Sequence, residues 1–282
     1  MVHRRRITVL GNLSVDLVDD GPPSPGGCPS FAGVGLAPLG NAALLVTRGA
    51  ENDLPLFTGM LRALEVPYRV LPAATTSSFG LRYSGGDDRQ MTVEAIGPSW
   101  TPEDLAGLDL GPWVHVSPLL RSDFPVEVLA ALTARGCRVS YDGQGLVRAP
   151  VVGPLTVDAD YDPAVLGHLQ VLKLADDEAD VLAGRPFDAE IATSLRVPEV
   201  VVTHGSGGCD LYLDGGQVHV PAARPISGVH TTGAGDMFTV TYVAARADGH
   251  EPVDAARRAS AFVADRLQER LDAQRRLDAQ RR

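Results

Sequence analysis

Short apolar runs recur along the chain, separated by stretches with helical periodicity. The runs are partly β-branched and lack strict alternation, which is typical of strands buried on both faces of a parallel sheet. The stretches 53–64 and 125–135 place their apolar residues on one stripe, and Gly136 follows the second as a helix stop. This order predicts right-handed crossovers and a doubly wound α/β sheet. The six predicted strands are 7–11, 42–47, 113–117, 137–142, 169–174 and 199–203.

One region breaks this alternation. Residues 79–96 contain two alternating runs around a Gly/Asp-rich turn, which predicts a β-hairpin. Because the hairpin lies between α/β units, we expect it to project from the main sheet as a lid; an edge hairpin without function is the alternative. The prediction is a single domain over residues 1–270, with a lid from about 12–26 and 73–97. A charged helical tail, 271–282, follows and contains LDAQRR twice.

Composition narrows the range of partners. The chain has 282 residues and a net charge of −10, so nucleic acid would repel it outside a local basic patch. Its basic clusters, residues 4–6 and the tail, are interpreted as solvated ends. No apolar run approaches the length needed to cross a bilayer. Three widely spaced cysteines without a CxxC pair predict free thiols in a reducing, cytoplasmic compartment and no zinc site.

The sharpest motif is TTGAGD at 231–236, followed by a helical stretch that stops at Gly249. It predicts a glycine-bearing turn at a helix N-terminus, where backbone N–H groups approach a ligand and the helix end adds partial positive charge. Such a turn can hold a phosphoryl group whose charge grows during transfer. Asp236, at the same helix start, can accept a proton from a hydroxyl group aimed at that phosphoryl group. Taken alone, the motif fits tight packing and a helix cap equally well.

Two further stretches place small or polar residues after predicted strands. The first strand is followed by Asn12, Asp16 and a pair of glycines at 26–27. Ligands of α/β sheets bind beyond the carboxyl ends of strands, so we expect these side chains to hydrogen-bond a polyol there; a capped turn is the alternative. The strand 199–203 ends in the loop 204–208, which can lie along a nucleotide's phosphates and ribose. The sequence has neither a Walker loop nor a dinucleotide-binding motif after its first strand.

Together these stretches resemble the ribokinase-like (PfkB) carbohydrate kinases over about residues 7–265. The glycine pair, the strand and loop 202–208 and the signature 230–236 occur in that family's order and spacing. The stretches 142–148 and 172–179 are most similar to the myo-inositol-kinase-like branch. The resemblance implies a ribokinase-like doubly wound, mostly parallel sheet flanked by helices, with a small β-hairpin lid. It also implies ATP-dependent transfer of the γ-phosphoryl group to a hydroxyl of a small polyol, cyclitol or sugar.

The resemblance also implies roles for individual positions. Asp236 is the implied general base, and Gly233, Ala234 and Gly235 form the implied anion hole. Arg148 is equally open to a structural ion pair. The implied acceptor contacts are Asn12, Asp16, Gly26, Gly27, Gln144 and Arg148. The implied ATP contacts are Lys173, Thr203, Gly205, Gly208 and Thr232, and Glu178 is implied to organise Mg²⁺ through water.

Four positions depart from the family pattern, and one of them is Met237, which is bulkier than the small residue often found after the base. His230 replaces the usual Asp at the start of the signature, which leaves dependence on a monovalent cation open. Ala175 replaces the usual Asn before Glu178, which changes how the metal is handled. Phe31 replaces an Asn found in many sugar kinases of the family and favours a different acceptor.

Three functions therefore remain open. A polyol, cyclitol or sugar kinase is favoured; a nucleoside kinase, with Phe31 stacked on the base, is the runner-up. A kinase-fold sensor that binds a small molecule without turnover is the third, motivated by His230 and Ala175. The expected partner is a small molecule, with no nucleic acid and no membrane, and a reduced lid predicts a monomer or a homodimer formed elsewhere.

Overall fold

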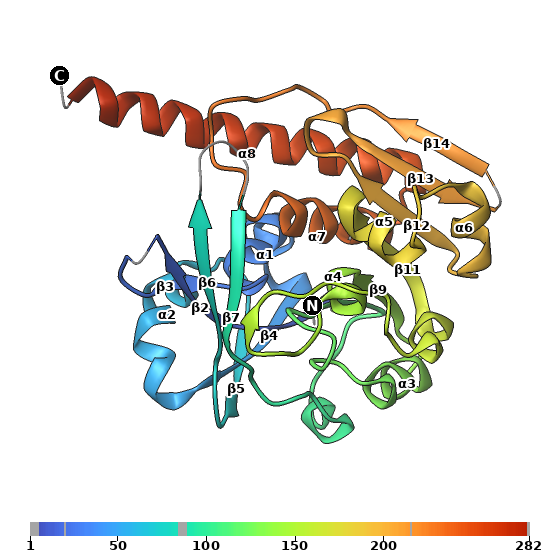
Figure 1. Ribbon diagram of the computed structural model, residues 1–282, viewed down its shortest axis with the longest axis horizontal. Helices are drawn as coiled ribbons and strands as arrows, with labels where there is room; N and C mark the ends of the chain where they lie inside the picture. Colours follow the sequence, from blue (N-terminus) through green and yellow to red (C-terminus); the bar gives the residue numbers. More distant parts are fainter. Residues whose placement is uncertain (1–5, 20, 84–88, 215, 281–282) are drawn as a thin grey trace.

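A nine-stranded sheet forms the centre of the protein (Figure 1). The computed structural model describes residues 6–19, 21–83, 89–214 and 216–280. The strands from β12 to β5 are parallel, and the edge strands β13 and β14 are antiparallel. In spatial order the strands are β14 (Gly216–Val220), β13 (Cys209–Leu213), β12 (Glu199–Thr203), β11 (Leu169–Ala175), β9 (Arg138–Asp142), β8 (Trp113–Ser117), β1 (Ile7–Asn12), β4 (Ala43–Ala50) and β5 (Tyr68–Ala73).

The six strands predicted from the sequence are confirmed, with ends shifted by up to three residues. The sheet adds three strands that the sequence analysis did not predict, β5, β13 and β14. β5 begins with exposed residues, so its apolar pattern is weak, and β13 and β14 pair as an antiparallel edge after the last parallel strand. The predicted alternation therefore holds for the parallel part of the sheet and ends where the edge begins.

Helices cover both faces of this sheet. Pro29–Leu36 (α1), Ala234–Ala247 (α7) and Pro252–Gln280 (α8) share one core with Ile7 and Val9. On the other face, Val126–Ala134 (α3), Asp176–Ala183 (α5) and Ala189–Ser194 (α6) share a core with Leu10 and Val114. Ile7 and Leu10 point to opposite faces because neighbouring side chains of a strand alternate. The remaining helices are α2 (Leu54–Ala63) and α4 (Gln144–Val147), with 3₁₀ turns at Ala37–Ala42, Glu51–Asp53, Pro102–Leu105, Pro163–His168 and Gly205–Gly207.

A second sheet, of five strands, contains strands from both segments predicted to form a lid. The predicted hairpin is present as β6 (Ser77–Tyr83) and β7 (Arg89–Ala95), which pair antiparallel; its turn, 84–88, lies outside the described residues. β2 (Ser14–Val18) and β3 (Ser24–Gly26), within the predicted lid segment 12–26, extend one edge of the hairpin, and β10 (Gly153–Pro154), outside both predicted segments, extends the other. The lid thus joins three distant stretches of sequence, and its strands stand beside α1 in Figure 1.

The C-terminal tail continues α8 without a break. The helix crosses the top of the molecule in Figure 1, above α7, and its far end projects beyond the body. Leu267 is buried, whereas Leu277 in the second LDAQRR repeat is 57% exposed. In the described part of the chain, no helix combines the length and the apolar character needed to cross a membrane.

Candidate active site

The candidate site lies at the carboxyl edge of the parallel strands, where α7 begins. Parallel strands end at the same edge of a sheet, so Asn12, Ser117, Asp142 and Thr203 all reach this edge. Asn12, Ser117 and Asp142 are buried, although polar residues are usually exposed. The edge therefore carries a concentration of polar groups that packing alone does not require.

The turn before α7 brings a glycine against an aromatic ring. Gly233 has φ +79°, a left-handed conformation that glycine adopts without strain. A Cβ at this position would overlap the ring of Phe31 on α1. The turn closes with a hydrogen bond from Ala234 N to Thr231 O of 2.9 Å. Glycine is thus required here by both the backbone and the space, and α1 supports the start of α7.

Asp236 lies in the first turn of α7 among fixed charges. The ammonium of Lys173, on β11, is 3.7 Å from Oδ1 of Asp142, on β9. The same ammonium is 3.4 Å from the position that a Cβ on Gly235 would occupy. Lys173 therefore lies directly beside the backbone that starts α7. Its pKa is raised, because the attraction of Asp142, Glu178 and Asp236 outweighs the opposing effect of burial.

Asp236 has the pKa of a usable base near neutral pH. Loss of solvent raises its pKa to about 6, and the negative charge of Asp142 adds to this effect. Lys173 and Arg148 oppose the rise, so the pKa stays below neutrality. A catalytic base works best when its pKa lies near the working pH, because it is then both ionised and basic. The surroundings of Asp236 meet this requirement.

Cys28 joins the N-terminal region to Asp236. It directly follows the glycine pair and precedes α1, and its thiol lies beside the Asp236 carboxylate, whose pKa it lowers. Burial raises the pKa of Cys28 well above its usual value, and the charge of Asp236 raises it further, so the thiol stays protonated and can donate. The contact brings the two stretches predicted to form the site, 12–27 and 231–236, to one place.

Asp16 and the glycine pair form a compact unit at the junction with the lid. Ser14 Oγ donates to Oδ1 of Asp16 at 2.7 Å. Asp16 on β2 faces β3, where a Cβ on Gly26 would overlap its carboxylate. Gly27 has φ +83°, and a Cβ there would collide with the backbone oxygen of Asn12. Each glycine is thus needed for a different reason: Gly26 for the Asp16 side chain and Gly27 for the turn itself.

The Asn12 side chain is buried more deeply than expected for a side chain whose only role is to contact a ligand. It is 4% exposed, and its Oδ1 accepts a 2.8 Å hydrogen bond from Nε1 of Trp100. Trp100 in turn stacks on Phe124. The structure therefore gives Asn12 an anchoring contact beneath the site, while its contact with an acceptor stays a prediction.

Gln144 begins the short helix α4, and Arg148 directly follows its end. They are half-buried, whereas the three residues between them are buried, as expected for positions four apart on a helical turn. Arg148 Nη2 lies 3.7 Å from Oε1 of Glu178. The predicted ion pair of Arg148 is therefore present, and its partner is the residue predicted to organise the metal.

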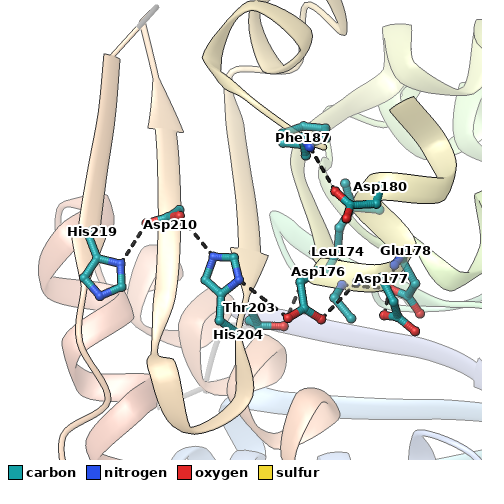
Figure 2. Close-up of polar contacts among 11 residues, drawn as sticks. Leu174, Asp176, Asp177, Glu178, Asp180, Phe187, Thr203, His204, Asp210 and His219 are labelled. Carbon is teal, nitrogen blue, oxygen red and sulfur yellow. Dashed lines mark hydrogen bonds and ion pairs between the residues drawn. The ribbon is translucent and has the colours of Figure 1, made fainter. Parts of the chain in front are cut away.

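The loop after β12 is fastened to its neighbours through His204 (Figure 2). His204 Nε2 lies 3.0 Å from Oδ2 of Asp210 on β13, and His204 Nδ1 lies 3.7 Å from Oδ2 of Asp176 at the start of α5. Thr203 Oγ1 donates to the carbonyl of Leu174 at 3.2 Å. These contacts hold the loop that contains Gly205 and Gly208 beside the first turn of α5. His204 therefore has a structural role.

Some predicted residues lie together and others stand apart. Asp236, Gly235 and Lys173 form one group, and Cys28 connects this group to the N-terminal stretch 12–27. Thr203, Gly205 and Gly208 form a separate loop, linked to Lys173 through the pairing of β11 and β12. Thr232 is exposed at the turn before α7. The lid touches this turn, since the ring of Tyr83 meets His230 edge-on at 6.2 Å.

Sequence reasoning missed two members of the site. Asp142 pairs with Lys173 and raises the pKa of Asp236, yet it was noted only as part of a resemblance. Its place at the end of a buried strand was an available signal. Cys28 was predicted only to be a free thiol, and no spacing in the sequence connects it to residue 236.

A magnesium ion fits this site only through water and phosphate. No group of three or more His, Cys, Asp or Glu side chains among the described residues is arranged to hold a metal by itself. Magnesium commonly binds through one or two carboxylates plus substrate phosphates and water. Glu178 provides one carboxylate, whose Oε2 accepts from Ala175 N at 2.9 Å. The residues present therefore suit a metal that arrives with its phosphates.

Comparisons with known proteins agree with this geometry. The family model "pfkB family carbohydrate kinase" matches residues 115–272. A fructokinase from Klebsiella pneumoniae is 29% identical over 260 residues, which cover 85% of this chain and 83% of that protein. An inositol 3-kinase from Oryza sativa subsp. japonica is 31% identical over 237 residues, which cover 76% of this chain and 55% of that protein.

A solved structure shares the whole architecture. It is described as a sulfate complex of "a pyrophosphate-dependent kinase in the ribokinase family", with a TM-score of 0.80 and 25% identity, and the match covers 93% of this chain and 95% of that one. Its likeness, together with the mostly parallel sheet flanked by helices, confirms the predicted ribokinase-like fold.

Proposed function

Because this chain belongs to the pfkB family of carbohydrate kinases, we propose that it transfers the γ-phosphoryl group of ATP to a hydroxyl group of a small polyol, cyclitol or sugar. One observation supports this most directly. Asp236, near the N-terminus of α7, contacts Cys28 and lies beside the Lys173–Asp142 pair. Cys28 directly follows the stretch 12–27, which is proposed to bind the acceptor and is called the acceptor loop. A base between an acceptor loop and a fixed cation suits phosphoryl transfer to an alcohol.

The proposed reaction follows from this arrangement. Asp236 accepts the proton of the acceptor hydroxyl as its oxygen forms a bond to the γ-phosphorus and the bond from that phosphorus to the leaving phosphate oxygen breaks. The amides of Gly233, Ala234 and Gly235 offset the negative charge on the transferred group. Lys173 adds a fixed positive charge at the same place, since its Nζ lies 3.4 Å from the position that a Cβ on Gly235 would occupy. Correct alignment of the two reactants supplies most of the rate.

The donor phosphates are proposed to lie between Lys173 and the loop of Thr203, Gly205 and Gly208. Mg²⁺ bound to them would neutralise their charge, with Glu178 holding it through water. Glu178→Gln retains an oxygen that can accept from Ala175 N, so α5 keeps its cap. We expect this variant to need a higher Mg²⁺ concentration for half-maximal rate, and EDTA to abolish turnover. Glu190→Gln, on the exposed part of α6, is the control.

The surroundings of Phe31 and Asp16 support a polyol acceptor over a nucleoside. The ring of Phe31 lies against Gly233, so it is already packed and is a poor platform for stacking on a base. This disfavours the nucleoside alternative. Asp16, held by Ser14, instead offers a carboxylate that accepts hydrogen bonds from a polyol. The inositol 3-kinase and fructokinase relatives give cyclitols and ketoses as the first acceptors to test.

A second donor is favoured by one comparison. The solved structure that is 25% identical belongs to a pyrophosphate-dependent kinase. The donor groups named above, Lys173 and the glycine amides, all address phosphate rather than a nucleoside, so they suit pyrophosphate as well as ATP. Rates with Mg·ATP and Mg·pyrophosphate, measured with the same acceptor, distinguish the two.

The test is a coupled turnover assay over cyclitols, ketoses and nucleosides, with each donor in turn. We expect Asp236→Asn to lower kcat at least a hundredfold with unchanged circular dichroism. Asp254→Asn, the same change at an exposed position on α8, is the control and should keep full activity. Turnover that survives Asp236→Asn would overturn the assignment. Acceptor binding without any turnover would instead favour a sensor.

A further inference from the structure

The turn that starts α7 is fastened from outside by α8. Arg270 Nη1 donates to the carbonyl oxygen of Thr232 at 2.9 Å and reaches that of His230 at 3.5 Å. Thr232 directly precedes Gly233, the residue that caps α7. One half-buried guanidinium therefore contacts two carbonyls of the turn that provides the proposed anion hole.

The same segment is attached to α8 at two more points. Ala223 N donates to Ser260 Oγ at 2.9 Å, and Arg224 forms an ion pair with Asp265. Residues 260 and 270 are about 15 Å apart along the helix axis. The connection 221–233 therefore follows α8 before it enters α7, and Arg270 is the last of its three attachments.

Peptide geometry connects Arg270 to the anion hole. In a trans peptide the C=O and the following N–H point in opposite directions. When Arg270 holds the oxygen of Thr232 toward α8, the N–H of Gly233 is directed away from α8. Gly233 has φ +79° and lacks a side chain, so its backbone can rotate more freely than that of another residue. The direction of its N–H group is therefore less strongly fixed by Gly233 itself.

We propose that Arg270 is a positioning residue, which orients the Gly233 amide for the phosphoryl group by holding the Thr232 carbonyl. This rests on the proposed kinase function. Arg270 lies in the last part of the chain, beyond the stretch that carries the family motifs. Arg270 directly precedes the charged tail 271–282, so the part of α8 next to the tail supplies a side chain to the turn before α7.

The variant Arg270→Met keeps the aliphatic stem and removes the donors. We expect kcat to fall at least tenfold, since small misplacements of a catalytic group cost up to about a hundredfold. The KM for the acceptor should change less than twofold and the melting temperature by less than about 2 °C. Arg275→Met, at an exposed position of the same helix, is the matched control and should behave as wild type. Methylguanidinium added to Arg270→Met should restore part of the rate.

A readout independent of turnover separates this inference from the proposed function. In protein labelled with ¹⁵N-glycine, the Gly233 amide signal should shift in Arg270→Met and stay in place in Arg275→Met. An unchanged Gly233 signal, or a kcat within twofold of wild type, would overturn the role of Arg270. If Arg270→Met does not fold, Arg270→Lys decides: a partial loss of kcat supports the role and full activity contradicts it. If wild type turns over no acceptor with either donor, the kinase proposal fails. The shift of the Gly233 amide signal then still tests whether Arg270 positions that amide.

Discussion

The thiol of Cys28 lies beside the carboxylate of Asp236 and lowers its pKa, although the two residues lie near opposite ends of the chain. Cys28 precedes α1 and Asp236 begins α7, and these helices pack together on one face of the main sheet. This contact joins the start of α1 to the proposed base, and Cys28 adds to burial, Asp142 and Lys173 in setting the pKa of Asp236.

The first prediction concerns the pH dependence of the reaction. Asp236 must be ionised to accept a proton, and its pKa is raised to about 6. We therefore expect kcat/KM for the acceptor to rise about tenfold per pH unit below 6 and to level off above it. The measurement is a pH profile at saturating donor. A flat profile between pH 5 and 7 would contradict Asp236 as the base.

The second prediction concerns stability. Asp236 ionises less readily in the folded protein than at its usual pKa of 3.8, so its charge opposes folding. This opposition is absent below pH 4, grows as the pH rises from 4 to 6, and is complete above 6. Asp236→Asn should therefore raise the free energy of unfolding at pH 8 by roughly 1–3 kcal/mol, but not at pH 4. Urea unfolding of both proteins at the two pH values provides the check.

A third prediction isolates the hydrogen bond from Cys28. Donation by the thiol lowers the pKa of Asp236, so losing the donor should raise it. Cys28→Ala should move the midpoint of the pH profile upward, by at least half a unit. Cys28→Ser keeps a donor and should leave the midpoint near that of wild type. Equal midpoints in the two variants would show that the hydrogen bond has no influence on the base.

The fourth prediction separates the two neighbouring glycines. Gly26→Ala would push aside the Asp16 carboxylate, so the acceptor KM should rise about tenfold with little loss of stability. Gly27→Ala forces an alanine to φ +83° and against the Asn12 backbone, which should cost about 1–3 kcal/mol of stability. Thermal melts and acceptor KM values for both variants test this contrast. The idea fails if both variants lose mainly stability.

A fifth prediction concerns the end of α8. Residues 273–280 are exposed, whereas Arg270 contacts the turn before α7. Deleting residues 273–282 should therefore leave kcat within twofold of wild type. Deleting 270–282 removes Arg270 and should lower kcat at least tenfold. Steady-state kinetics of the two shortened chains provide the comparison, and equal loss in both would place the effect elsewhere in the tail.

Much of the parallel sheet was predictable, because buried strands such as Val200–Val202 leave a strong apolar signal. The start of α7 was also predictable, since a glycine turn followed by apolar residues at helical spacing is typical of a helix N-terminus. The lid strands β2 and β3 were harder, because prolines at 22, 23 and 25 make this stretch resemble a loop. Contacts such as Arg270 to Thr232 or Cys28 to Asp236 depend on tertiary packing, and no local pattern encodes them.

The division of the site between two sheets has an evolutionary consequence. Asp16 and Gly26 belong to the lid strands β2 and β3, whereas Asp236 and Lys173 belong to the main body. Under the proposed function, a mutation in β2 or β3 changes the surface that meets the alcohol and leaves the residues around the transferred phosphate where they are. A scaffold built in this way can acquire a new substrate by drift in one small sheet, without first losing its chemistry.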